Sequence, residues 1–264
     1  MKQKALLVTN TLTLIFALVM SALSGSGMFN DTTQADISDR YETLVTPSGY
    51  AFSIWGLIYL LLISFTVFQW VEYLKYGRDE NIKRTGTWFA LSNVANGTWI
   101  IAFLNHHIGL SVAIMLILLF SLIMLTLRLR LEVWDAPVRI IAFVWWPVCI
   151  YLGWIIAATV ANISVYLVST GWQGGSISPQ TWAVVIIIVA SLIYLLLIYF
   201  RNMREAALVG VWALTAIAVR QWEMNASVAV AAITASVVLF IAASVHGYKN
   251  QETSPFEKIK RGEI

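Results

Sequence analysis

Residues 107–127 read HIGLSVAIMLILLFSLIMLTL, and no Asp, Glu, Lys or Arg interrupts them. A helix needs about 20 consecutive apolar residues to cross the hydrocarbon core of a bilayer. The preceding stretch, 86–105, is similarly apolar, and polar residues at Asn105 and His106 divide the two. A single helix of roughly 40 residues would be too long for a bilayer at about 1.5 Å per residue. The sequence therefore predicts two spanning helices joined by a short turn.

The rest of the chain has the same character. Of its 264 residues, 59% are hydrophobic and 12% are charged, whereas soluble domains carry about 25% charged residues. This composition is typical of a protein whose surface faces lipid. We expect an all-α integral membrane protein with eight transmembrane helices, near residues 5–26, 51–74, 86–105, 107–127, 139–166, 180–200, 205–222 and 227–247.

The basic residues predict an orientation. If the N-terminus lies inside, all of the 17 Lys and Arg residues except Arg40 and Arg220 fall on the inner side of the eight predicted spans. Short inner loops of membrane proteins carry this excess of positive charge. We therefore predict a protein of the bacterial plasma membrane, with both termini in the cytoplasm and loop 27–50 outside. The N-terminal apolar segment is longer than a usual signal-peptide core, and we expect a retained helix.

Several classes of function have little support in the sequence. No basic run with interleaved aromatic residues suggests a nucleic-acid partner. Cys149 is the single cysteine, which excludes an internal disulfide framework and a cysteine-based metal cluster. The three histidines fall at predicted helix ends, so no metal site is predicted. No nucleophile–base pair or phosphate-binding loop occurs, and the expectation is a protein without a conventional catalytic site.

The predicted spans contain aromatic and amide side chains instead of charges. Tryptophans near helix ends fit the aromatic belt at the membrane interface, but Trp99 and Trp154 lie well inside their spans. Asn96 shares a helix face with Trp99, and Asn162 shares one with Trp154. Two roles are open for these amides: hydrogen bonds to a ligand, or hydrogen bonds that pack one helix against another.

Three motifs point to a known family. Residues 47–59 read PSGYAFSIWGLIY, residues 89–103 read FALSNVANGTWIIAF and residues 150–162 read IYLGWIIAATVAN. Together with Tyr41, these motifs make residues 41–166 resemble the TspO/translocator protein family, the tryptophan-rich sensory proteins. The chain departs from the pattern in two ways. Ile150 replaces an expected proline, and three predicted helices follow the five-helix unit, so the chain looks like an extended, divergent member.

The resemblance implies a division of the chain. Residues 1–166 would form the TspO-like five-helix unit, 167–179 an outer loop, 180–247 three additional transmembrane helices and 248–264 a cytoplasmic tail. In the family, the five helices enclose an aromatic pocket for flat hydrophobic molecules, covered by the loop after the first helix. The ligand-binding residues implied here are Tyr41, Pro47, Phe52, Trp55, Tyr59, Asn96, Trp99, Tyr151, Trp154, Ala158 and Asn162.

The function implied is a membrane receptor for tetrapyrroles such as protoporphyrin IX or haem, with a sensory or transport role. No cofactor is required by this reading. The partners expected are the lipid bilayer, the ligand and a second copy of the chain in a homodimer. Two alternatives stay open: a facilitative transporter of a hydrophobic small molecule, and a structural or regulatory membrane protein whose aromatic cavity is closed by packing. Light-dependent porphyrin breakdown, as attributed to some relatives, would use the pigment's own photochemistry.

Overall fold

The computed structural model describes residues 2–26, 32–172 and 174–263, and the part of loop 27–50 at 27–31 lies outside them. Each of the eight predicted segments is helical, with ends within a few residues of those expected. The long helices are α1 (Lys2–Ser24), α3 (Ile54–Tyr76), α5 (Trp88–Leu104), α6 (Ile108–Leu129), α8 (Trp146–Ser169), α9 (Pro179–Arg201), α10 (Arg204–Gln221) and α11 (Ala226–Lys249).

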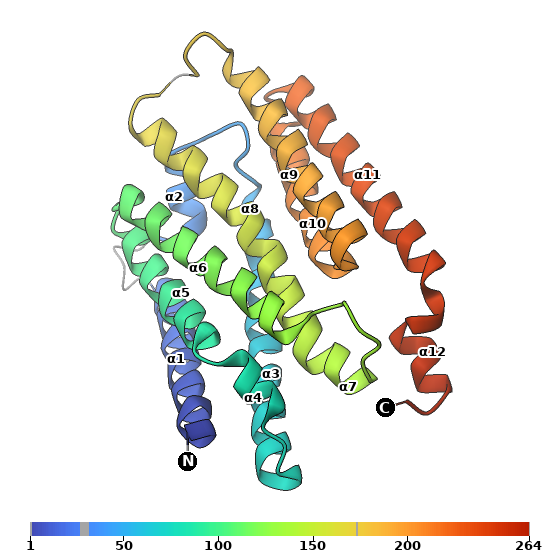
Figure 1. Ribbon diagram of the computed structural model, residues 1–264. Helices are drawn as coiled ribbons and strands as arrows, with labels where there is room; N and C mark the ends of the chain where they lie inside the picture. The colour runs from blue at the N-terminus through green and yellow to red at the C-terminus, as the bar shows by residue number, and fades with distance from the viewer. Residues whose placement is uncertain (1, 27–31, 173, 264) are drawn as a thin grey trace.

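The helices run up and down in one bundle (Figure 1). Helix α5 packs between α1 and α6, and α8 contacts α3, α6 and α10. Helices α9, α10 and α11 pack together, and α10 joins this group to the rest of the bundle through α8. Both chain ends lie at the lower end in Figure 1, whereas α2 and the connection between α8 and α9 lie at the upper end.

The predicted number of spans is supported only in part. Among the described residues, six helical segments are long and apolar enough to cross a membrane. The two long helices outside this group are α5, which has 17 residues, and α10, which includes Arg204, Glu205 and Arg220. The large apolar side chains exposed on the outer faces, such as Leu60 and Phe200, would contact lipid in an integral membrane protein.

Short elements occupy the connections. They are α2 (Gln34–Arg40), η1 (Gly49–Ser53), α4 (Glu80–Thr85), α7 (Val138–Ile140), η2 (Ile141–Trp145), η3 (Gln251–Thr253) and α12 (Pro255–Lys260). The sequence predicted a loop where α2 lies and a tail where α12 lies. Helix α2 begins with a capping box, because Thr33 and Asp36 each accept a hydrogen bond from the other's backbone N–H. The tail returns to the bundle, where Lys258 pairs with Asp135 and donates to Ala136 O at 2.6 Å.

A π-helical segment, η2, precedes α8. Pro147 has no backbone N–H, and its ring would clash with the carbonyl of the residue four positions earlier in a regular α-helix. A locally wider turn removes that conflict, which accounts for the π geometry at Ile141–Trp145. From Trp146 onward α8 is regular as far as Ser169, so the segment that carries Trp154 and Asn162 is a straight run of α-helix.

Candidate functional site: a closed aromatic cavity

A small cavity lies in the half of the bundle nearer to α2 and the following loop. Its volume is about 40 Å³, and its wall is almost entirely apolar. Side chains reach it from α2, the loop between α2 and η1, η1 itself, α3, α5, α8 and α10. The lining residues are Ser38, Val45, Pro47, Phe52, Trp55, Trp99, Phe103, Trp154, Ala157, Ala158, Ala161, Asn162, Val165, Ala213 and Ile217.

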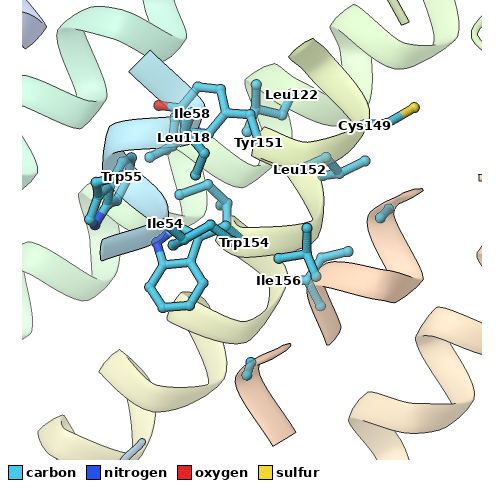
Figure 2. Packing of buried hydrophobic residues seen from close by; sticks show 14 of the residues in the cluster. Ile54, Trp55, Ile58, Leu118, Leu122, Cys149, Tyr151, Leu152, Trp154 and Ile156 are labelled. Atoms are coloured by element: carbon cyan, nitrogen blue, oxygen red, sulfur yellow. The ribbon is translucent and has the colours of Figure 1, made fainter. Parts of the chain in front are cut away.

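Aromatic rings form the greater part of the wall. Trp55 lies with its ring centre 6.3 Å from both Trp99 and Trp154, tilted against the first and edge-on to the second. Phe103 stacks on Trp99 at 5.1 Å, and Phe52 meets Trp154 edge-on at 6.0 Å. Figure 2 shows Trp55 on α3 facing Trp154 on α8. These offset and edge-to-face arrangements are the ones that aromatic quadrupoles favour.

Asn96 and Asn162, deep in the bundle, form hydrogen bonds between helices. Asn162 accepts a hydrogen bond from Trp99 Nε1 at 2.9 Å and donates to Ser111 Oγ at 2.9 Å, which ties α8 to α5 and α6. Asn96 accepts from the hydroxyl of Tyr59 at 2.9 Å, which ties α5 to α3. These contacts are the helix-packing role that the sequence left open, although the side chain of Asn162 also reaches the cavity wall.

Two other polar atoms at the cavity have no such partner. Within the described part of the chain, the buried indole nitrogens of Trp55 and Trp154 meet no hydrogen-bond acceptor. A buried N–H without an acceptor is costly, about 1–3 kcal/mol. Both nitrogens belong to side chains that line the cavity, which makes them candidate donors to an oxygen atom of a ligand.

Of the residues predicted from the sequence, seven line the cavity: Pro47, Phe52, Trp55, Trp99, Trp154, Ala158 and Asn162. The other four do not. Tyr59 stacks on the outer side of Trp55 at 5.4 Å and holds Asn96, while Tyr151 meets the Trp55 ring edge-on at 6.0 Å. Tyr41 lies farther away, with its hydroxyl 3.3 Å from His106 Nδ1.

Sequence reasoning did not predict eight of the lining residues: Ser38, Val45, Phe103, Ala157, Ala161, Val165, Ala213 and Ile217. Val45 comes from the loop after α2, and Ala213 and Ile217 come from α10. The spacing of four between Ala213 and Ile217 places both on one helix face, but nothing in an apolar helix marks which face meets a cavity. The consequence is that the C-terminal group of helices, for which the sequence offered no role, supplies one side of the site.

Helix α10 also holds the covering loop, residues 39–51, over the cavity. Arg220 pairs with Asp39 and, at 3.3 Å, with Glu42. Farther along the loop, the backbone N–H of Ser48 donates to Ala216 O at 3.1 Å, and Trp212 Nε1 donates to Ala51 O at 3.1 Å. Three points of attachment thus fix the covering loop to one helix.

Charged groups near the ends of the bundle have perturbed acidities. The Thr33 hydrogen bonds lower the pKa of Asp36 at the start of α2. Burial, followed by the charge of Glu205, raises the pKa of Glu132 to about 8, and Arg204 opposes this rise. Among the described residues, no three His, Cys, Asp or Glu side chains are grouped so as to hold a metal ion.

Apolar helices around a buried aromatic cavity, with a short helix and loop over it, define a helical integral membrane protein with an internal site. Residues 6–245 match the model of a protein family described as TSPO-like protein, and the chain belongs to that family. The resemblance inferred from the three motifs is therefore confirmed. The match reaches well into α11, beyond the residues 41–166 that carry those motifs.

Comparison with curated proteins and with solved structures found no significant match. Membership of the TSPO-like family suggests a membrane protein that binds or transports a ligand.

Proposed function

We propose that this protein is a membrane receptor for flat hydrophobic ligands of the tetrapyrrole class, such as protoporphyrin IX or haem. The observation that carries the proposal is the convergence of Trp55, Trp99 and Trp154 on one cavity, and the indole N–H groups of Trp55 and Trp154 meet no acceptor among the described residues. Indole faces offer stacking surface to a planar ring, and the free N–H groups suit oxygen atoms at its edge.

The cavity must expand for such a ligand to enter. Sites for small molecules usually measure about 300–1,000 Å³, and the cavity here measures about 40 Å³. The part of the wall that we expect to move is the turn at residues 43–46, because it lies between the points at which the loop is attached to α10 and is closed by its own hydrogen bonds.

The proposal includes a placement in the membrane. In this placement, α5, α10 and the six longer helical segments all cross the bilayer, which gives eight spans. Both termini then face the cytoplasm of a bacterial cell, and the covering loop faces outward. Arg40 and Arg220 are the two basic residues on the outer side. Each has a partner there: Arg40 donates to His106 at 3.3 Å, and Arg220 pairs with Asp39 and Glu42.

A titration tests the binding function. Purified protein in lipid nanodiscs is titrated with protoporphyrin IX, and the change in porphyrin absorbance gives Kd. We expect saturable binding that Trp99→Ala and Trp154→Ala each weaken at least about tenfold, equivalent to about 1.4 kcal/mol. Trp222→Ala is the matched control, because that indole is exposed and does not line the cavity. Absence of saturable binding, or equal Kd values in all four proteins, contradicts the proposal.

A second candidate is favoured by the cavity volume itself. A volume of about 40 Å³ holds a few water molecules at most, which suits a structural membrane protein whose aromatic cavity has closed by packing. The same titration separates the two functions. A structural role predicts that porphyrin does not bind. It also predicts a large loss of thermal stability in Trp154→Ala, because removal of a buried indole leaves a cavity.

A further inference from the structure

A second, larger hollow lies beside the aromatic cavity. It is a cleft of about 600 Å³ between the end of α8 and the start of α9. Most of its lining is apolar, with Leu167, Val168 and Trp172 on one side and Trp182, Ala183 and Ile186 on the other. The sequence motifs do not include any of these residues. This cleft is far closer in volume to a small-molecule site than the cavity is.

The cleft is placed at the level of the membrane interface. Trp172 and Trp182 lie with ring centres 5.4 Å apart at its upper end, and Trp182 Nε1 donates to Gly174 O at 2.8 Å. Tryptophans concentrate where the hydrocarbon core meets the headgroups. The rest of the lining on α8 and α9 is mostly aliphatic, and both helices carry exposed apolar side chains, so in a bilayer the cleft would adjoin acyl chains.

One side chain separates the cleft from the aromatic cavity on the loop side. Val45 lines both hollows and is 4% exposed. On α8 the two hollows also share a boundary, because Val165 lines the cavity while Ser164 and Leu167 line the cleft. Val45 is the one described residue common to both linings, so its displacement would bring the cleft and the cavity together.

The turn that carries Val45 is local. Thr46 N–H donates to Thr43 O at 3.1 Å, and Thr43 N–H donates to Thr46 Oγ1 at 3.0 Å, so Thr43–Thr46 is closed by its own hydrogen bonds. The strong attachments of the loop to α10 lie on either side of this turn, at Asp39 and Glu42 before it and at Ser48 after it. Movement confined to this turn would leave those attachments in place, whereas opening of the loop from above would break them.

We propose that the cleft between α8 and α9 is the lateral entrance by which a planar hydrophobic ligand passes from the loop-side leaflet of the bilayer to the aromatic cavity, with Val45 as the gate. The inference rests on the proposed binding function. Its physical reason is that such a ligand concentrates in the bilayer through the hydrophobic effect, so a route from lipid avoids transfer through water.

The test separates rates from affinity. Ala183→Trp fills the cleft at a position that does not line the cavity. Stopped-flow porphyrin fluorescence with protoporphyrin IX in nanodiscs should show association and dissociation both slowed at least about fivefold, with Kd changed less than about twofold, because the entrance is not part of the bound state. Ile188→Trp is the matched control on the same helix, since its side chain is lipid-facing and 52% exposed.

Val45→Ala supplies the opposite test with a smaller change in packing, and it should speed both rates at least about threefold. Saturable binding with wild-type rates in Val45→Ala, or in a folded Ala183→Trp, overturns the entrance while leaving the binding function intact. Absence of saturable binding by the wild-type protein overturns both proposals.

Discussion

The side-chain amide of Asn162 connects three helices. Its oxygen accepts from Trp99 on α5, and its nitrogen donates to Ser111 on α6. Water is not available inside a bilayer to replace these partners, so an amide at depth must find them in protein or ligand. The same reasoning applies to the indole N–H groups of Trp55 and Trp154, which are buried and meet no acceptor among the described residues.

Glu132 gives a prediction about pH at the opposite end of the molecule. It lies in the connection between α6 and α7, and its pKa is raised from 4.5 to about 8 by burial and by Glu205, with Arg204 opposing. The folded protein therefore holds a proton that the unfolded chain releases above pH 4.5. Stability should fall as pH rises from about 4.5 to about 8 and then level off, because the unfolded state binds fewer protons in that window.

Glu132→Gln should remove this dependence. The neutral amide mimics the protonated acid, so the variant should have a higher Tm than wild type at pH 8.5 and nearly the same Tm at pH 4.5. Thermal unfolding in detergent, followed by tryptophan fluorescence across this range, measures the effect. Parallel pH profiles for the two proteins would show that Glu132 ionises normally.

At the scale of elements, α10 has the widest set of roles. It lines the cavity through Ala213 and Ile217, and it anchors the covering loop through Arg220. Its position against α8 depends on Gly153, where an added Cβ would come within 2.7 Å of Ala206 O and 2.9 Å of Ala206 Cα. The neighbouring α9 is fixed at the same point, since Tyr194 donates to Gly153 O at 2.8 Å.

Gly153→Ala should accordingly push α10 away from α8. We expect a destabilisation of about 1–3 kcal/mol, because the methyl group meets backbone atoms that cannot turn aside. Gly56→Ala on α3 is the matched control: nothing lies within 4 Å of its added Cβ, and alanine is the better helix former by about 1 kcal/mol. Denaturant unfolding in mixed micelles measures both variants. Equal stability in the two would mean that α8 and α10 are not in tight contact.

At the scale of the whole molecule, the even number of long helices places both chain ends at one end of the bundle. This arrangement can be tested with single cysteines, because Cys149 is the one cysteine in the sequence and is buried. Gly175→Cys, in the connection between α8 and α9, should react with a membrane-impermeant maleimide in intact cells. Asn250→Cys, after α11, should react only after the cells are permeabilised. Labelling of both positions in intact cells would contradict eight crossings.

The positions of the long helices could be predicted because apolar length and the scarcity of charge are local properties. Helix α2 was missed because its capping box lies in a polar segment of seven residues, too short for a periodic pattern. For the candidate site, the motifs predicted seven lining residues. Tyr41, Tyr59, Asn96 and Tyr151 lie outside the lining, because spacing gives the helix face but not whether the tip of a side chain meets a cavity or a neighbouring group.

The sequence alone indicated a helical membrane protein of the TSPO-like family, because apolar length and motif spacing are properties of consecutive residues. Only the tertiary structure decided which polar groups hydrogen-bond between helices. It also decided that α10 contributes to the cavity wall and that the cavity is small. These features depend on contacts between distant segments: Trp99 and Asn162 are 63 residues apart, and Asp39 and Arg220 are 181 apart. No local pattern encodes such pairs, because each partner has several apolar or polar neighbours that would serve equally well until the helices pack.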